Sequence, residues 1–225
     1  SLATDDDAVF DKVVTLDVNH EHADSVFLED TAVMLEDVTI LGAMGTPSRR
    51  DEVAGIEAEL RARGLASRFE RLPTSATLEG GDVLRVGRTC GVGATGRTNE
   101  AGFEAFSRIV RQHGYEARRV RTPGCLHLKT ACTALPDGTM LVNPRWLETG
   151  DLADRELLPI AEGEAGAANV VLVGERVIMA AAHPQTIALV RARGFEVEAV
   201  DLSEFAKAEG STTCLSLLIS PSPSS

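Results

Sequence analysis

The stretch TAVMLEDVTIL (residues 31–41) consists of an apolar segment, a short acidic turn and a second apolar segment. Runs of apolar and β-branched residues on both sides of a short polar turn predict a β-hairpin. The same pattern returns as DVLRVGRTCGV (82–92), ACTALPDGTMLV (131–142) and NVVLVGERVIM (169–179). Because the four starts lie about 40 to 50 residues apart, the chain is predicted to be built from repeated units.

A helical segment, and usually one more strand, is expected after each hairpin. The helices are predicted over residues 48–63, 99–113 and 185–193, with Ser48 as a cap and with Gly64, Gly114 and Gly194 just after the three ends. The later strands are predicted over 69–72, 115–120 and 195–200, and residues 13–16 over an earlier strand of the same kind. The repeated unit is therefore hairpin, helix, strand.

A fifth unit begins at TTCLSLLI (212–219) and runs into the Ser/Pro-rich residues 221–225. Five such units predict an α/β fold, a five-bladed propeller of ββαβ modules whose closure leaves few exposed sheet edges. We expect the first or fifth blade to be incomplete at the N-terminus, because the acidic lead segment 1–11 is a poor strand. Residues 1–225 are expected to form a single domain with 221–225 as a flexible tail.

Composition excludes several classes of protein. The 225 residues are 44% hydrophobic and 25% charged, an ordinary globular mixture. With 34 acidic and 22 basic residues the formal net charge is -12, which argues against nucleic-acid binding and suits a cationic small molecule. No apolar run reaches the ~18 residues that a membrane span requires. The four cysteines lack a paired spacing and no export signal is visible, so reduced thiols and a cytoplasmic location are expected.

Ionisable residues recur where the hairpins open. They are Glu29 and Asp30, Glu79 and Asp82, His127 and Lys129, and Cys214. If the first strands line a common axis, a thiol, an imidazole and several carboxylates converge there, and this set is typical of nucleophilic catalysis. Each residue alone has a plainer interpretation as a buried cysteine, a hydrogen-bonded histidine or a turn residue, but their common position in the repeat favours a catalytic site.

Several motifs resemble those of the dimethylarginine dimethylaminohydrolase family, in the guanidino-group-modifying superfamily. They are LEGGDVL (78–84), RTN (97–99), LHLK (126–129), TCLS (213–216), DSVFLED (24–30) and PSRR (47–50). The resemblance extends from about residue 13 to residue 219 and implies the five-bladed α/β propeller of that superfamily. It also implies a hydrolase, without metal or cofactor, that converts Nω-methylated arginine to citrulline and dimethylamine through a covalent thiouronium on cysteine.

The resemblance further implies a role for individual residues. Cys214 resembles the nucleophile, His127 the general acid and base, and Glu79 the carboxylate that orients the histidine. The expected substrate contacts are Asp30 and Glu29 at the guanidinium, Arg49 and Arg97 at the α-carboxylate, Asp24 near the α-amino group, and Glu209 as a second acidic contact. The partner is thus a small cationic amino acid, with no nucleic acid and no membrane. The oligomeric state stays open, and a homodimer is one candidate.

Three alternatives stay open. An arginine deiminase-like hydrolase would use the same residues on an unmethylated guanidino group. An inactive arginine-binding relative would keep the pocket without turnover, because the family's lid segment is expected to be absent or replaced by residues 1–11. The stretch GVGATG (91–96) matches the dinucleotide-binding pattern, but a short turn ties it to the preceding strand, whereas a Rossmann unit needs a helical crossover.

Overall fold

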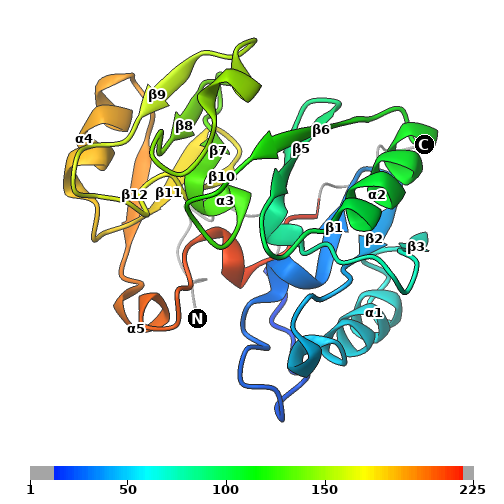
Figure 1. Ribbon diagram of the computed structural model, residues 1–225. Helices are drawn as coiled ribbons and strands as arrows, with labels where there is room; N and C mark the ends of the chain where they lie inside the picture. The colour runs from blue at the N-terminus through cyan, green and yellow to red at the C-terminus, as the bar shows by residue number, and fades with distance from the viewer. Residues whose placement is uncertain (1–12, 220–225) are drawn as a thin grey trace.

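The computed structural model describes residues 13–219, and within this range the chain is an α/β protein with four sheets of three strands each (Figure 1). In every sheet the first two strands form an antiparallel hairpin, and the third strand lies parallel to the second. The lead segment 1–11 and the tail 221–225 lie outside the described residues.

All four predicted hairpins are confirmed. They are β1 (Ala32–Met34) with β2 (Thr39–Leu41), β4 (Val83–Val86) with β5 (Thr89–Ala94), β7 (Cys132–Ala134) with β8 (Met140–Val142), and β10 (Val171–Val173) with β11 (Arg176–Ala180). The closing strands are β3 (Phe69–Arg71), β6 (Glu116–Arg121), β9 (Leu157–Pro159) and β12 (Val197–Val200). Because β5 contains Gly91 and Gly93 of GVGATG and pairs antiparallel with β4, these residues do not form the turn of a Rossmann unit.

The longer helices follow three of the hairpins, as predicted, at α1 (Glu52–Ala62), α2 (Glu100–Gln112) and α4 (Pro184–Ala192). A short helix, α5 (Ser203–Ala206), follows the last sheet. The predicted cap at Ser48 is wrong, because Ser48 lies in a separate 3-10 turn, η2 (Pro47–Arg49), and helix α1 begins after Asp51. The buried side chain of Arg49, the last residue of this turn, pairs with Asp30 and with Glu52 at the start of α1.

Three other expectations fail. Residues 13–16 belong to no sheet, and Val13 is 52% exposed, so the short alternation of apolar residues there is not buried against a neighbour. Residues 216–219 likewise form no strand after the 3-10 turn η5 (Thr213–Leu215). The third unit has no helix between β8 and β9, where a loop contains only the 3-10 turn η4 (Thr149–Leu152).

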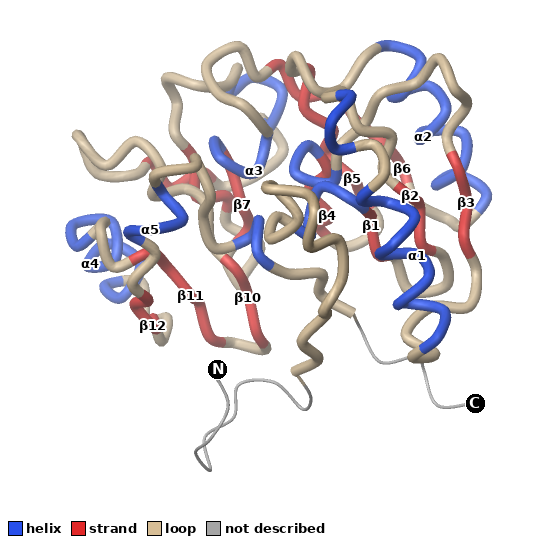
Figure 2. Tube along the Cα trace, turned by 90° about the horizontal axis from the view of Figure 1, so that it is seen from below, coloured by secondary structure: helices blue, strands red, loops and turns tan. Residues whose placement is uncertain are grey.

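Helices α2 and α4 lie toward opposite sides of the molecule, and the first strand of each sheet lies nearer the middle (Figure 2). One core fills the space between the first two sheets and α2, with Ile40, Leu78, Val92, Phe106 and Val110 among its members. A second core joins the last two sheets to α4, and a third, smaller cluster packs β6 against β8. The longest helix of the described residues, α2 with 13 residues, is too short to cross a bilayer.

Candidate active site

Short helical turns from four distant segments meet in the middle of the molecule (Figure 1). They are η1 (Leu28–Thr31), η3 (Gly80–Asp82), α3 (Leu128–Ala131) and η5. Turn η1 contacts both η3 and η5, and α3 contacts η3. The first three turns each run directly into the first strand of a sheet, so the repeat brings the ionisable residues of separate units together.

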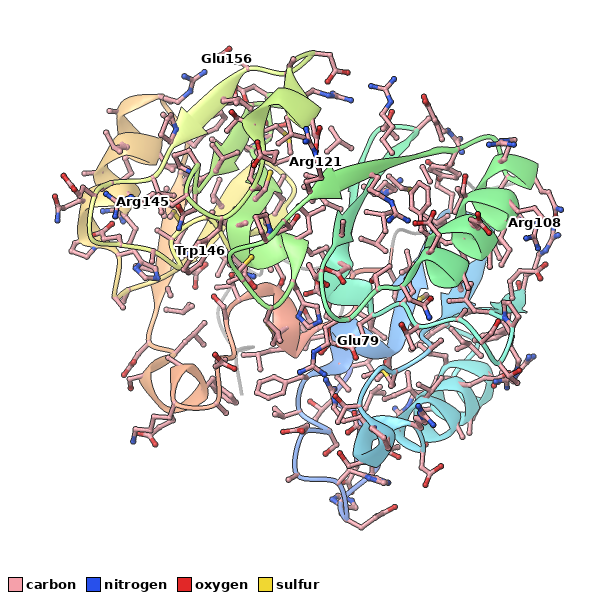
Figure 3. All side chains as sticks on the ribbon, in the orientation of Figure 1. Glu79, Arg108, Arg121, Arg145, Trp146 and Glu156 are labelled. Atoms are coloured by element: carbon pink, nitrogen blue, oxygen red, sulfur yellow. The ribbon has the colours of Figure 1, made fainter. Side chains whose placement is uncertain are left out.

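His127 and Glu79 form a buried pair, and Glu79 lies in the middle of the molecule (Figure 3). The imidazole Nε2 lies 2.8 Å from Glu79 Oε2 and 3.7 Å from Asp30 Oδ1. The other oxygen of Glu79 accepts a hydrogen bond from the backbone N–H of Gly45 at 3.0 Å. Because Glu79 is fully buried and held at both oxygens, it fixes the orientation of the imidazole.

The surroundings of His127 favour its protonated form. Burial alone would lower the pKa of the imidazole, but the hydrogen bond to Glu79 and the charges of Asp30 and Asp82 outweigh it and raise the pKa above its usual value. The protonated imidazole, which can donate a proton to a leaving group, is therefore favoured over the neutral one.

The two glycines of the Glu79–Asp82 motif permit close packing. A Cβ atom at Gly80 would lie 2.0 Å from the backbone oxygen of Glu29. A Cβ atom at Gly81 would lie 2.8 Å from Asp30 Oδ1 and 2.9 Å from His127 Nδ1. The glycines thus let turn η3 approach both η1 and the imidazole, a reason that the sequence pattern alone does not reveal.

Asp82 anchors the segment that carries His127, a function that the sequence did not assign. Its side chain is fully buried and accepts hydrogen bonds from the hydroxyls of Thr95 and Thr98, each at 2.6 Å. Its other oxygen accepts the backbone N–H of Leu128, directly after His127, at 2.9 Å. The available signal was its place directly before β4, the first strand of a repeated unit.

The thiol of Cys214 lies half-buried in η5. Burial, and then the negative charge of Glu29, raise its pKa to about 11, so the free thiol is neutral at pH 7. The described contacts include no hydrogen bond between Cys214 and His127, although the charge of Asp30 acts on both groups. A cation bound beside the sulfur would reverse the effect of these carboxylates and lower the pKa of the thiol.

Glu29, predicted at the substrate guanidinium, is engaged on both oxygens in this structure. Oε1 accepts from Lys129 Nζ at 2.7 Å, and Oε2 accepts from the hydroxyl of Thr213 at 2.5 Å. Turns η1, α3 and η5 are thereby connected through one carboxylate. Its role toward a substrate stays a prediction.

Arg49 is buried and fully engaged. Its Nη1 lies 2.7 Å from Asp30 Oδ2, its Nη2 lies 2.9 Å from Glu52 Oε2, and Nη2 also donates to the backbone oxygens of Asp24 and Phe27. The two carboxylates raise the pKa of the guanidinium well above its ordinary value. Arg49 would have to leave these partners, at least in part, to bind a substrate carboxylate.

The remaining predicted contacts are less buried. Arg97 is half-buried, donates to the hydroxyl of Thr46 and lies 3.7 Å from Glu79. The side chain of Asp24 is half-buried, whereas Glu209 is exposed, with a left-handed backbone at φ 61°. The guanidinium of Arg97 is less buried than that of Arg49 and is therefore the better placed of the two to bind a substrate carboxylate.

Asp30, Glu79 and His127 also form a group that could hold a metal ion, because their ligand atoms all lie within 4.8 Å of one another. Two oxygens and one nitrogen suit a divalent cation. The same three groups also suit proton transfer without a metal, since a carboxylate-paired imidazole is an acid–base group in its own right.

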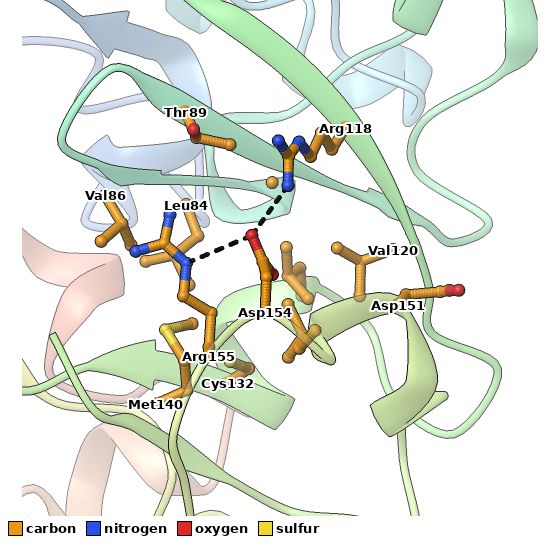
Figure 4. A pocket seen from close by; sticks show the side chains of 13 residues that line it. Leu84, Val86, Thr89, Arg118, Val120, Cys132, Met140, Asp151, Asp154 and Arg155 are labelled. Atoms are coloured by element: carbon orange, nitrogen blue, oxygen red, sulfur yellow. Dashed lines mark hydrogen bonds and ion pairs between the residues drawn. The ribbon is translucent and has the colours of Figure 1, made fainter.

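A separate hollow lies between the second and third sheets (Figure 4). Its volume is about 40 Å³, and Leu84, Val120 and Leu128 are among its apolar lining residues. Asp154 at its rim lies 2.9 Å from Arg118 and 3.9 Å from Arg155. A space of this size holds a few water molecules but no amino acid, so the meeting point of the turns is the stronger candidate site.

Sequence comparisons identify relatives over most of the chain. No protein-family model matches it. The chain is 41% identical over 194 residues to the N(G),N(G)-dimethylarginine dimethylaminohydrolase of Streptomyces coelicolor, covering 86% of this chain and 74% of the relative. It is 33% identical over 205 residues to the enzyme of that name from Pseudomonas aeruginosa, covering 91% of this chain and 80% of the relative.

Solved structures agree with these relatives. The Pseudomonas aeruginosa enzyme, as a cysteine-to-serine variant complexed with citrulline, superposes with a TM-score of 0.82 at 32% identity, covering 88% of this chain and 77% of that one. The N-terminal domain of a cyanobacterial arginine dihydrolase gives a TM-score of 0.78 at 23% identity, over 87% and 76% of the two chains. The second likeness is one of fold alone.

Proposed function

The chain belongs to the dimethylarginine dimethylaminohydrolase family, and from that premise we propose that it hydrolyses Nω-methylated arginine to citrulline and dimethylamine at Cys214. The observation that carries the proposal is the buried group of Asp30, Glu79 and His127 next to the turn of Cys214. This group combines a cation-binding carboxylate with a protonated imidazole, and the reaction requires both.

Substrate recognition follows from charge. Asp30 and Glu29 would hold the N–H groups of the guanidinium, because carboxylates bind this planar cation through paired hydrogen bonds. At the other end of the substrate, Arg97 and Arg49 would bind the α-carboxylate and Asp24 the α-amino group, with Glu209 as a further acidic contact. The net charge of -12 favours the approach of a cationic amino acid.

The guanidinium itself would activate the nucleophile. Its positive charge beside Cys214 offsets the carboxylates that raise the thiol pKa, so the thiol loses its proton to solvent when substrate binds. The thiolate then attacks the central carbon and forms a C–S bond and a tetrahedral centre. The imidazolium of His127 donates its proton to the dimethylamino nitrogen, the C–N bond breaks, and a thiouronium remains on Cys214.

The second half of the reaction uses the same groups. His127, now neutral, takes a proton from water, and the resulting hydroxide attacks the thiouronium carbon. Collapse of this second tetrahedral centre breaks the C–S bond and returns the thiolate, and loss of the hydroxyl proton to solvent gives citrulline. Glu79 stabilises the imidazolium in both halves through its hydrogen bond to Nε2.

The proposal extends to the number of propeller units and to the compartment of the protein. We propose that residues 212–219 are part of a fifth unit of the propeller, arranged with the four sheets around one axis in a single domain. The proposed compartment is the cytoplasm, because the nucleophile must stay a reduced thiol, and all four cysteines are free.

The decisive test is citrulline release from Nω,Nω-dimethylarginine and from arginine under the same conditions. We expect release from dimethylarginine at the higher kcat/KM and none with Cys214→Ser, because a hydroxyl without a strong base is a far weaker nucleophile. A preference for arginine would instead identify a deiminase, and binding of either compound without product would identify a non-catalytic relative.

A further inference from the structure

The turn that carries Cys214 has little backbone support. Turns η1, η3 and α3 each continue into a strand, whereas the described residues after η5 form none. The hydrogen bond that closes η5, from the N–H of Ser216 to the oxygen of Thr213, is long at 3.5 Å. The position of the sulfur must therefore depend on side chains that hold the turn.

Asn169 supplies most of that support. It lies just before β10, is 2% exposed and borders Thr212 and Thr213. Its Oδ1 accepts from the hydroxyl of Thr212 at 2.8 Å and from the backbone N–H of Thr213 at 2.9 Å. Its Nδ2 donates to the hydroxyl of Thr213 at 3.0 Å and to the backbone oxygen of Lys129 at 3.1 Å.

The chemistry of these partners determines which way the amide points. The N–H of Thr213 can only donate, and the oxygen of Lys129 can only accept, so the side-chain oxygen faces residue 213 and the nitrogen faces residue 129. Both N–H groups of the amide are then engaged inside the protein, and its oxygen accepts the N–H of Thr213 while the Thr212 hydroxyl lies 2.8 Å from both the side-chain and the backbone oxygen of Asn169. Among common side chains, only an unionised amide of this length provides two donors and two acceptors here.

The contact continues beyond Asn169. The hydroxyl of Thr213 accepts from Asn169 and donates to Glu29, whose other oxygen is paired with Lys129. The chain segment that carries His127 is thereby connected, through residue 129 and Asn169, to the segment that carries Cys214. We infer that Asn169 is a positioning residue that sets the distance of the Cys214 sulfur from the acid–base pair. This inference rests on the proposed function of Cys214.

The test compares Asn169→Ala with Asn143→Ala. Asn143 is a matched control because it is also a buried asparagine, and its hydrogen bonds go to the oxygen of Ala165 in the same loop and to the N–H of Arg145, not to residues 212–214. Two rates are measured for each folded variant: kcat for Nω,Nω-dimethylarginine, and alkylation of Cys214 by iodoacetamide at pH 8, followed by peptide mass spectrometry.

We expect the two rates to move in opposite directions in Asn169→Ala. Loosening the turn exposes the sulfur and removes it from Glu29, so its pKa falls toward the ordinary value and alkylation accelerates about tenfold. At the same time kcat falls by at least about tenfold with KM changed less, because the sulfur is displaced from the acid–base pair. Asn143→Ala should leave both rates within about threefold of the wild type.

If Asn169→Ala does not fold, Thr213→Val and Thr213→Ser test the same contact from the other side. Thr213→Val should behave as described for Asn169→Ala, and Thr213→Ser, which keeps the hydroxyl, should resemble the wild type. Alkylation rates that agree within either pair of variants would overturn the inference. Wild-type protein that releases no citrulline would overturn the proposed function instead, and the alkylation rates would still report on the turn.

Discussion

The turns that carry His127 and Cys214 are built in different ways. The segment of His127 runs into strand β7, packs against the glycine at residue 81 and is anchored by Asp82. The turn of Cys214 continues into no described strand and is held by the side chains of Asn169 and Glu29. The acid–base half of the site is thus fixed by backbone packing, and the nucleophile half by a few polar contacts.

The largest effect that we expect is the change with pH in the rate at which the free thiol of Cys214 is alkylated. Because the pKa of Cys214 is raised to about 11, its thiolate fraction grows about tenfold per pH unit below that value. Alkylation of Cys214 should therefore rise about a thousandfold between pH 7 and pH 10. The rate is measured by peptide mass spectrometry, and Cys90, which is fully buried, is the internal control. A plateau that begins near pH 7 would mean that the thiolate is already stabilised without substrate.

The His127 side is tested by Glu79→Gln. Loss of the carboxylate charge removes the main group that raises the imidazole pKa, so the protonated acid is lost at a lower pH than in the wild type. We expect kcat to fall about 100-fold and the alkaline limb of the pH–kcat profile to move to lower pH.

Glu164→Gln is the matched control for this change. Glu164 is also a buried carboxylate, but its oxygens accept the backbone N–H groups of Gln185 and Thr186 at the start of α4. The pH–kcat profile of Glu164→Gln should keep the wild-type shape. An unchanged alkaline limb in Glu79→Gln would show that His127 is not the group that titrates.

A smaller effect is expected from Gly81→Ala. A methyl group there would lie within 3 Å of both Asp30 Oδ1 and His127 Nδ1, so the imidazole must shift. We expect about a tenfold loss of kcat, since small displacements of a catalytic group are costly. Gly150→Ala is the control, because nothing lies within 4 Å of its added Cβ atom. Wild-type kcat in Gly81→Ala would mean that the packing of η3 is not needed for the reaction.

Local patterns explain why so much of the fold could be predicted. Each hairpin has its own turn signal, such as the Asp137–Gly138 pair, in which Gly138 has φ 85° and Asp137 accepts the N–H of Thr139. The failures at residues 13–16 and 216–219 occur where a strand would need a partner that the local sequence does not specify. Strand formation depends on such partners, whereas turns and helix ends depend on neighbouring residues.

In the candidate site, too, the features that depend on local sequence could be predicted and those that depend on distant partners could not. Glu79 and His127 could be predicted to meet because they open repeated hairpins. The roles of Asp82 and Asn169 could not be assigned, since their partners lie up to 46 residues away in the sequence and include backbone groups that carry no residue-specific signal. The engagement of Arg49 by Asp30 and Glu52 was missed because it depends on burial, which the motif PSRR does not encode.

The smallest effect on kcat should come from Asn99, which stabilises helix α2 and supports neither the turn of His127 nor that of Cys214. The side chain of Asn99 caps α2 by accepting the N–H of Gly102 at 2.8 Å, and it also donates to the oxygen of Ser75. Asn99→Ala should lower the free energy of unfolding by about 1 kcal/mol in urea titrations and leave kcat within about twofold. Asn99→Asp keeps the capping oxygen and should lose less stability. A large loss of kcat in Asn99→Ala would contradict the comparison, because the acid–base half would then depend on helix ends outside the turns as well as on its own packing.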